Sequence, residues 1–437
     1  MIPRPLFDLL DGRRPMDAVV SFGSVEALSH ARFRQRVAGL CQSLKGCRSA
    51  ALVCEDSAAF AIGLFALLHA GADIVLPPNS RPATLETLTG EVERVIDDRA
   101  VWNAPLGQGE LPPIPHDAAI RFFTSGSTGQ PKQISRSLAM LEREAQVLES
   151  LWDQTHAASP VLSMVSHQHL YGLTFKILCP LAFGRPFHAG THEVWESLLE
   201  AMPPQAMLVV SPAHLSRMGG LTPLTPSHVP SAVLSAGAPL PFEASRQAEA
   251  ILHRRPTEIF GSTETGAVAF RRQAEEDQPW SLLPGHRLLD HDEGLLRLIS
   301  PYDGQEITTA DQIEPCDGGF RFLGRGDRIA KIAGKRVGLA EVESALAALP
   351  SIHAAAAVVL PDESLAAAAV LTFEGRSQLA KIGAFRLSRD LRRQLAASLD
   401  SAALPKRWRF VAELPHHPLG KSNNAALRAL FAEEPAE

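Results

Sequence analysis

Cysteine pairs, long apolar runs and basic tracts are all missing from this sequence, and each absence excludes a class of protein. The five cysteines form no Cys-x-x-Cys pair, so we expect reduced thiols, as in a cytoplasmic protein. The longest apolar run, residues 58–68, is too short to span a bilayer. The N-terminal Met-Ile-Pro-Arg-Pro does not resemble a secretory leader. We therefore expect a cytoplasmic location and no membrane span.

Charge and length limit the partners and the architecture. The net charge of −6 comes without any basic run or aromatic–basic stripe, which argues against a nucleic-acid partner. With 437 residues, of which 45% are hydrophobic, the chain is long enough for two or three globular domains.

Predicted strands and helices alternate along much of the chain. Buried strands are predicted at residues 49–54, 72–76, 206–210 and 231–235. An apolar helix is predicted between the first two strands, at residues 57–70. This alternation indicates an α/β fold in which helices flank a sheet. The alanine runs at 354–357 and 366–369 suit buried strands or tightly packed elements.

The first functional signal is a loop rich in glycine and hydroxyl side chains. Its glycines let successive backbone N–H groups converge on an anion, its hydroxyls add donors, and its lysine adds a positive charge. A predicted strand at 118–123 and a predicted helix at 137–151 give it the strand–loop–helix setting of a phosphate-binding loop. The residues concerned are Thr124, Ser125, Gly126, Ser127, Thr128, Gly129 and Lys132.

The spacing of this loop differs from that of a Walker A loop. A Walker A loop needs Gly-x4-Gly-Lys followed by serine or threonine, whereas here Gln133 follows the lysine. A P-loop kinase is therefore disfavoured. A Gly/Ser-rich surface turn is the plain alternative.

Five further motifs follow in order. They are Ser235-Ala-Gly-Ala-Pro-Leu240, Ile259-Phe-Gly-Ser-Thr-Glu-Thr-Gly266, Thr309-Ala-Asp311, Gly319-Phe-Arg-Phe-Leu-Gly-Arg-Gly-Asp327 and Leu414-Pro-His-His-Pro-Leu-Gly-Lys421. Each alone has a plain interpretation as a helix cap, a turn or a surface charge. Together with the glycine-rich loop they resemble the adenylate-forming superfamily, which comprises acyl- and aryl-CoA synthetases, peptide-synthetase adenylation domains and luciferases.

The resemblance implies an ATP site with bound Mg²⁺. Phe260 would lie against the adenine, Thr263 would contact the α-phosphate, and Glu264 would hold the metal. Thr263, Glu264, Arg325 and Lys421 would be catalytic, with Lys421 bridging the carboxylate and the α-phosphate. The residues expected to contact the nucleotide are Thr124, Ser125, Gly126, Ser127, Thr128, Gly129, Lys132, Gly237, Ala238, Phe260, Gly261, Ser262, Thr263, Asp311, Arg325 and Lys421.

The same resemblance implies two domains. Residues 1–325 would form a large N-terminal nucleotide-binding domain of sheets flanked by helices, and residues 328–437 a small α+β lid, with the hinge near Asp327. The path of a phosphopantetheine thiol would be lined by Lys331, Gly334 and Arg336. A basic β-hairpin that turns on Gly334 is the plain alternative for this segment.

The acid to be activated is indicated by a second set of residues. His169, in Met164-Val-Ser-His-Gln-His-Leu-Tyr-Gly-Leu173, resembles the family's gate residue, although a core histidine is the alternative. Ser235, Gly237 and Gly261 complete the expected substrate site. Peptide-synthetase domains place an aspartate in this region, and none occurs between residues 161 and 179. An aryl or short acyl acid is therefore favoured over an amino acid, and His167 has no assigned role.

No carrier domain follows Lys421, so the expected acceptor is a separate acyl carrier protein or coenzyme A. Compact stand-alone members of this kind resemble the ligases of bacterial aryl-polyene and xanthomonadin pigment pathways, which load hydroxybenzoate-type acids onto a carrier protein. An arginine-rich stretch could dock an acidic carrier or be a solvated helix face. It contains Arg386, Arg389, Arg392 and Arg393. A coenzyme A ligase and a non-catalytic nucleotide-binding relative are the alternatives, and the presence of Glu264 and Lys421 counts against the second.

Overall fold

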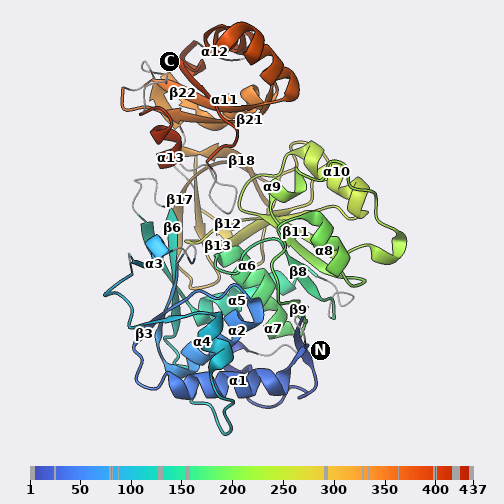
Figure 1. Cartoon of the computed structure of the whole chain (residues 1–437), viewed down its shortest axis with the longest axis vertical. Coiled ribbons are helices and arrows are strands. Elements are labelled where there is room, and N and C mark those ends of the chain that lie inside the picture. The colour runs from blue at the N-terminus through green and yellow to red at the C-terminus, as the bar shows by residue number, and fades with distance from the viewer. Residues whose placement is uncertain are drawn as a thin grey trace.

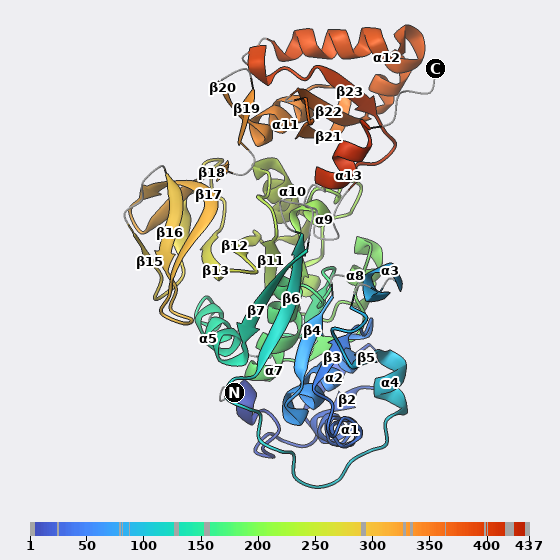
Figure 2. The same ribbon diagram turned by 90° about the vertical axis from the view of Figure 1, so that its left-hand side faces the viewer.

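The fold consists of a large body and a small C-terminal unit (Figures 1 and 2). The computed structural model describes residues 5–23, 26–77, 80, 82–86, 88–125, 131–152, 158–289, 294–326, 329–332, 335–362, 364–396, 399, 401–415 and 424–432. The small unit, orange to red in Figure 1, lies at one end of the long axis.

The large body contains a sheet of thirteen strands, as traced through the described residues. Its strands run in the order β15 (Arg287–Leu288), β16 (Leu295–Ile299), β17 (Glu306–Cys316), β18 (Gly319–Arg325), β14 (Trp280–Leu282), β13 (Gly266–Arg271), β12 (Thr257–Ser262), β11 (Ala232–Ala236), β10 (Met207–Val210), β8 (Val161–Ser163), β9 (Phe187–His188), β1 (Val19–Phe22) and β2 (Leu28–Ser29). From β12 to β1 neighbouring strands are parallel, whereas from β12 to β15 they are antiparallel. The carboxyl ends of the parallel strands meet at one edge, which is where open α/β sheets bind ligands.

A second sheet lies beside the first. In the described residues it contains β5 (Arg94–Ile96), β3 (Ser49–Leu52), β4 (Asp73–Leu76), β6 (Ala119–Ser125) and β7 (Pro131–Ser137). The predicted strands at 49–54, 72–76, 206–210 and 231–235 are thus confirmed as β3, β4, β10 and β11.

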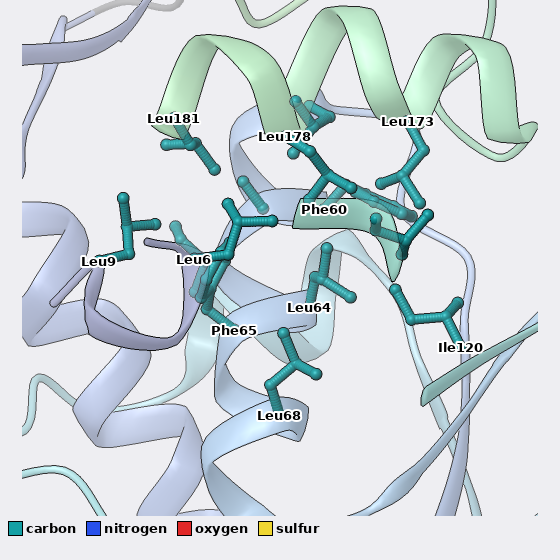
Figure 3. Close-up of a cluster of buried hydrophobic side chains, with 14 of the residues drawn as sticks. Leu6, Leu9, Phe60, Leu64, Phe65, Leu68, Ile120, Leu173, Leu178 and Leu181 are labelled. Carbon is teal, nitrogen blue, oxygen red and sulfur yellow. The ribbon is translucent and has the colours of Figure 1, made fainter. Parts of the chain in front are cut away.

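Helix α2 (Ser57–Ala70) lies in the centre of the main core. Every residue from Ser57 to His69 is buried, because both the second sheet and the helices around η3 (Leu173–Leu178) cover it, as Figure 3 shows for Phe60, Leu64 and Leu173. The side chain of Asp56 caps the helix by accepting a hydrogen bond from the N–H of Ala59. Gly71, in the left-handed region, ends it.

The remaining helices of the large body lie around the two sheets (Figure 2). They are η1 (Leu6–Asp8), α1 (His30–Ser43), α3 (Pro82–Glu86), α4 (Asp98–Asn103), α5 (Leu138–Glu149), α6 (Leu170–Gly172), α7 (Cys179–Phe183), α8 (Trp195–Ala201), α9 (Pro212–Leu215), η4 (Pro226–His228) and α10 (Phe242–Leu252).

The C-terminal unit has an α+β fold with its own apolar core. Its elements are β19 (Ile329–Ile332), β20 (Lys335–Gly338), α11 (Leu339–Ala347), β21 (Ile352–Val359), β22 (Leu365–Leu371), α12 (Phe373–Leu395), η6 (Ser401–Ala403), β23 (Arg407–Phe410) and α13 (Asn424–Ala429). Both alanine runs lie in β21 and β22, and Ala366 to Ala369 are fully buried. The expected large N-terminal domain and small C-terminal lid are therefore confirmed.

The exact domain boundary stays a prediction. Strand β18 ends at Arg325 and β19 begins at Ile329, and Asp327, the expected hinge, lies outside the described residues. No helix in the described ranges combines the length and the apolar character that crossing a bilayer requires.

The expected strand–loop–helix setting of the glycine-rich loop is wrong in one respect. Residues 131–137 form the strand β7, which pairs antiparallel with β6 before α5 begins. The burial of residues 133–137 alternates along the chain, as expected of a strand with one solvated face. The loop therefore connects two strands of a hairpin, and the helix predicted at 137–151 is confirmed as α5, which begins directly after β7.

Candidate nucleotide and acid site

The Thr-Glu motif forms the tight turn between β12 and β13. A Cβ atom on Gly261 would lie 2.1 Å from the carbonyl oxygen of Gly266, so only glycine fits at position 261. Gly266 has a φ of +69°, which also favours glycine. Thr263 is half-buried and Glu264 is exposed at the tip of the turn. The motif glycines are thus explained by backbone geometry.

Two hydroxyl side chains fix the turn from inside. The Oγ1 of Thr265 accepts a hydrogen bond from the N–H of Ser262 at 3.0 Å and donates one to the carbonyl of Gly266 at 2.7 Å. The Oγ of Ser262 accepts a hydrogen bond from the N–H of Thr265 at 3.2 Å. Ser262 therefore shapes the turn through its side chain, in addition to any contact with a nucleotide.

Phe260 belongs to an aromatic cluster. Its ring meets those of Trp280, Phe320 and Phe322 edge-on, with centroid distances of 5.3, 5.2 and 5.4 Å. The guanidinium of Arg271 lies over the Trp280 ring, 4.4 Å from its centroid. Phe260 itself is only half-buried, so a face of this cluster is open to a planar ligand.

The turn of small residues at the end of β11, positions 235–238, leaves the same edge of the sheet as the Thr-Glu turn after β12. Ser235 pairs with Glu258 in the parallel β11–β12 ladder, so the turns after β11 and β12 leave the same edge of the sheet, with β12 extending to Ser262 beyond the end of β11. Ser235 is fully buried, and its hydroxyl has no hydrogen-bond partner among the described residues. Gly237 has a φ of +101°, and Ala238 is exposed. Backbone without large side chains thus lines this part of the edge.

A buried acidic residue holds the small-residue turn in place. Glu258 is 2% exposed and accepts a hydrogen bond from the N–H of Leu240 at 3.0 Å. Arg271 donates to both carboxylate oxygens, at 2.7 and 3.0 Å, and Gln273 donates to one of them at 2.7 Å. This carboxylate is fully hydrogen-bonded, as a buried charge requires.

Asp311, in the middle of β17, lies opposite Arg325, the last residue of β18. The two residues are register partners in the antiparallel ladder. Arg325 Nη1 is 3.6 Å from Asp311 Oδ1. The N–H of Asp311 also donates to the Oγ1 of Thr309 at 3.1 Å.

The gate region is anchored by His167. Its Nδ1 is 3.0 Å from the Ser57 hydroxyl and its Nε2 is 2.8 Å from the Cys54 carbonyl. Because a carbonyl only accepts, Nε2 carries the proton and Nδ1 accepts from Ser57. Burial lowers the pKa of His167 to about 3, so the ring is neutral. His167 therefore ties this loop to α2 and to the segment that follows β3, and His169, 8% exposed, is the N-cap of α6.

Several predicted residues are described only through their backbone. Thr124 and Lys132 are partners in the β6–β7 ladder, as are Ser125 and Pro131. Lys331 is the partner of Arg336 in the β19–β20 hairpin. The residues that lie outside the described ranges are Gly126, Ser127, Thr128, Gly129, Asp327, Gly334 and Lys421.

Sequence reasoning missed several buried charged residues near these turns and the gate region. Lys176, in the π-helical segment η3, is fully buried and donates to the Gly190 carbonyl at 2.9 Å and the Thr191 hydroxyl at 2.7 Å. Burial lowers its pKa to about 7. A lone lysine in an apolar stretch was the available signal. Arg136 and Glu144 form another missed set, a buried ion pair at 3.2 Å behind the Thr-Glu turn.

Known proteins of one enzyme family match this chain in sequence. The sequence profile of the AMP-binding enzyme family matches residues 80–292, and that of the AMP-binding enzyme C-terminal domain matches residues 341–421. The 4-coumarate–CoA ligase of Cereibacter sphaeroides is 30% identical over 305 residues, which is 70% of each chain.

Solved structures share the fold. An ATP-bound RpMatB–BxBclM chimera aligns over 98% of this chain and 99% of its own, with a TM-score of 0.82 at 19% identity. A benzoate CoA ligase from Burkholderia xenovorans aligns over 98% of this chain and 100% of its own, with a TM-score of 0.78 at 18% identity. The chain therefore belongs to the AMP-binding family of adenylate-forming enzymes, and it is a ligase.

Proposed function

We propose that this ligase activates an aryl carboxylic acid of the hydroxybenzoate type with ATP and transfers the acyl group to the phosphopantetheine thiol of a separate acyl carrier protein. The observation that carries the proposal is the meeting of two turns at one sheet edge. The Ser235–Ala238 turn presents small residues, and the turn that carries Thr263 and Glu264 presents a hydroxyl and a carboxylate. A planar acid and a nucleotide phosphate fit side by side against such an edge.

The nature of the acid is supported by three observations. No aspartate occurs between residues 161 and 179 to bind a substrate ammonium group. His169 follows the anchored His167, next to the strand edge. Relatives named as 4-coumarate and benzoate ligases share the sequence pattern or the fold.

In the first half-reaction a carboxylate oxygen attacks the α-phosphorus of ATP, and the bond to the β-phosphate oxygen breaks. Pyrophosphate leaves and an acyl-adenylate forms. Thr263 would donate to the α-phosphate, Lys421 would bridge it to the carboxylate, and the loop from Thr124 to Lys132 would hold the outgoing phosphates. Mg²⁺, when bound, would neutralise phosphate charge, and the exposed Glu264 carboxylate is a donor that this cation takes alongside phosphate oxygens.

In the second half-reaction the thiol sulfur attacks the acyl carbon, and the bond to the AMP oxygen breaks. The thiol proton goes to solvent, and AMP leaves. We place the turning point between the domains at Asp327, with residues 1–325 on one side and 328–437 on the other. Lys331, Gly334 and Arg336 would line the thiol path, with Lys331 opposite Arg336 across the hairpin.

The carrier protein is favoured over free coenzyme A by one face of α12. Gly383, with a φ of +79°, divides this helix. Beyond Gly383 the four arginines at 386, 389, 392 and 393 are exposed, and so is 79% of Phe385. Basic side chains around an exposed aromatic ring complement an acidic partner surface.

The test begins with acid-dependent ATP–pyrophosphate exchange over benzoates, cinnamates, fatty acids and amino acids. Strong exchange with a hydroxybenzoate supports the proposal, whereas exchange confined to fatty or amino acids contradicts the pocket assignment. Absence of exchange with every acid would favour the non-catalytic alternative. Lys421→Ala should abolish exchange yet spare thioester formation from supplied acyl-adenylate, and Arg336→Glu should impair mainly the second step.

The identity of the thiol acceptor is tested by comparing two acceptors in parallel. Wild-type protein and an Arg389→Glu/Arg393→Glu variant are given either a holo-carrier protein or coenzyme A. Loss of turnover with the carrier alone supports carrier docking on α12. Efficient turnover with coenzyme A and none with the carrier would make the protein a coenzyme A ligase.

A further inference from the structure

We propose that Arg136 is a positioning residue, which fixes the turn carrying Thr263 and Glu264 and thereby sets how well the enzyme binds ATP together with Mg²⁺. The inference rests on the proposed metal role of Glu264. It assigns a function to a buried ion pair that lies outside every sequence motif.

The contact between Arg136 and the turn is direct. Arg136 lies in β7, is 1% exposed, and donates from Nη1 to the carbonyl oxygen of Glu264 at 3.0 Å. Its Nη2 donates to Glu144 Oε2 at 3.2 Å. The guanidinium carbon lies 5.9 Å from the centroid of the Tyr302 ring. One side chain thus joins β7, α5 and the turn after β12.

Glu144 and Tyr302 hold the other side of the same turn. Glu144 Oε1 accepts a hydrogen bond from the N–H of Ala267 at 2.9 Å. The Tyr302 hydroxyl donates to the carbonyl of Ala267 at 2.6 Å. Both backbone polar groups of Ala267 are therefore satisfied by side chains from outside the hairpin, at the point where pairing with β14 has stopped.

Gly266 shows that the pair and the turn are fitted to each other. A Cβ atom at this position would lie 2.7 Å from both Arg136 Nη2 and Glu144 Oε2. The pair occupies the space that any other residue would need. A side chain at 266 would have to displace the ion pair or distort the turn.

A purely stabilising role accounts poorly for this arrangement. Glu144 is 3% exposed and lies on the apolar stripe of α5 with Leu141 and Leu148. Removing two charges from water is costly, and apolar residues of similar size often serve a core equally well. What an apolar pair cannot supply is the hydrogen bond to the Glu264 carbonyl, which restrains the backbone from which the metal-binding carboxylate extends.

Strand β7 also connects the turn to the glycine-rich loop. The strand begins at Pro131, within the glycine-rich motif, and ends at Ser137, next to Arg136. The same strand therefore anchors the expected phosphate loop at one end and the Thr-Glu turn at the other. This gives Arg136 a defined place between the two halves of the nucleotide site.

The test compares four proteins by calorimetric titration with ATP in Mg²⁺ and with ATP in EDTA, without any acid present. They are wild type, Glu264→Gln, Arg136→Met/Glu144→Leu, and Arg185→Met/Glu149→Leu. The last is a matched control, because Glu149 is on the same helix and pairs with the 2% exposed side chain of Arg185 at 2.5 Å, away from the turn. Arg136→Lys is added as the conservative variant.

We expect Arg136→Met/Glu144→Leu to lose about tenfold in affinity for ATP with Mg²⁺ while its affinity in EDTA is unchanged. Glu264→Gln should show the same pattern, the control should match wild type, and Arg136→Lys should recover part of the loss. Thermal unfolding and near-UV circular dichroism verify that each variant is folded. If the double variant does not fold, Tyr302→Phe, which removes one hydrogen bond to Ala267, should show a smaller Mg²⁺-specific loss.

Two results would overturn the inference. One is an equal loss of affinity with and without Mg²⁺, which a merely structural role predicts. The other is a loss in the double variant with none in Glu264→Gln. Failure of the proposed function is recognised separately, because a wild-type protein that binds ATP with Mg²⁺ but catalyses no acid-dependent exchange leaves the positioning result intact.

Discussion

Asp311 and Arg325 face each other across β17 and β18, with 3.6 Å between Oδ1 and Nη1. Asp311 is almost fully buried and the Arg325 side chain is 43% exposed. They come from two separate sequence motifs, yet the antiparallel register makes them one unit. The arginine is in position to orient this carboxylate, which we expect to accept hydrogen bonds from the ribose hydroxyls of the nucleotide.

Asp311→Ala should raise the KM for ATP about 10- to 100-fold, because hydrogen bonds to a charged group are each worth about 1.5–3 kcal/mol. Pyrophosphate exchange at varied ATP concentration measures the effect. Glu314→Ala is the matched control, since Glu314 pairs with Arg321 on the same two strands but is 61% exposed. Equal effects of the two substitutions would contradict a ribose contact.

Glu258→Ala should destabilise the protein by about 3 kcal/mol, because it leaves the largely buried Arg271 side chain without its carboxylate partner and frees the turn at Leu240. Urea unfolding followed by circular dichroism measures this loss. An exposed pair, Arg297 with Glu306, offers the comparison, and Glu306→Ala should cost less than about 1 kcal/mol. A loss below that level for Glu258→Ala would mean that water replaces its hydrogen bonds.

Gly261→Ala should abolish exchange while most of the fold survives. The added methyl would lie 2.1 Å from a backbone oxygen of Gly266, so the Thr-Glu turn must open. Gly219→Ala, where nothing lies within 4 Å of the added atom, should leave exchange unchanged. Wild-type exchange in the Gly261 variant would show that the turn tolerates reshaping.

Lys176 should make stability depend on pH above neutrality. Its folded pKa is lowered to about 7 by burial, whereas an unfolded lysine titrates near 10.4. Between these values the unfolded chain binds more protons, so the free energy of unfolding rises with pH, by at most about 1.4 kcal/mol per unit. The stability present at high pH is lost as the pH falls toward 7.

The measurement is urea unfolding of wild type and Lys176→Met at pH 7.0, 7.75 and 8.5. The Met variant should lack the lysine-dependent part of the rise. Lys381→Met, which changes an exposed residue, should follow wild type. Identical pH profiles for wild type and Lys176→Met would mean that Lys176 stays charged in the folded protein.

Sequence patterns predicted those parts of the fold that depend on local periodicity. The strands and helix between residues 49 and 76 followed from apolar runs of suitable length. The β7 strand was missed because a seven-residue segment, of which the first two residues belong to the glycine-rich motif, has too little periodicity to indicate a strand. Family resemblance, rather than periodicity, placed Asp311 and Arg325 in one site.

The residues behind the turns could not be found in this way. Glu144 sits in an ordinary helical pattern, and its partners at positions 136 and 267 are set by the packing of α5 against two different sheets. Glu258 looks like a surface residue until the position of Arg271 across the hairpin is known. Such contacts depend on tertiary structure, and a single sequence contains no record of them.

The aromatic cluster contains a fluorescent residue, Trp280, next to the expected adenine site. Trp280 touches the half-exposed Phe260 on one side and the Arg271 guanidinium on the other. We expect an adenine bound against Phe260 to alter the polarity and quenching around this indole. Nucleotide binding should therefore change the intrinsic fluorescence of the unlabelled chain, and Trp280→Phe should remove that change.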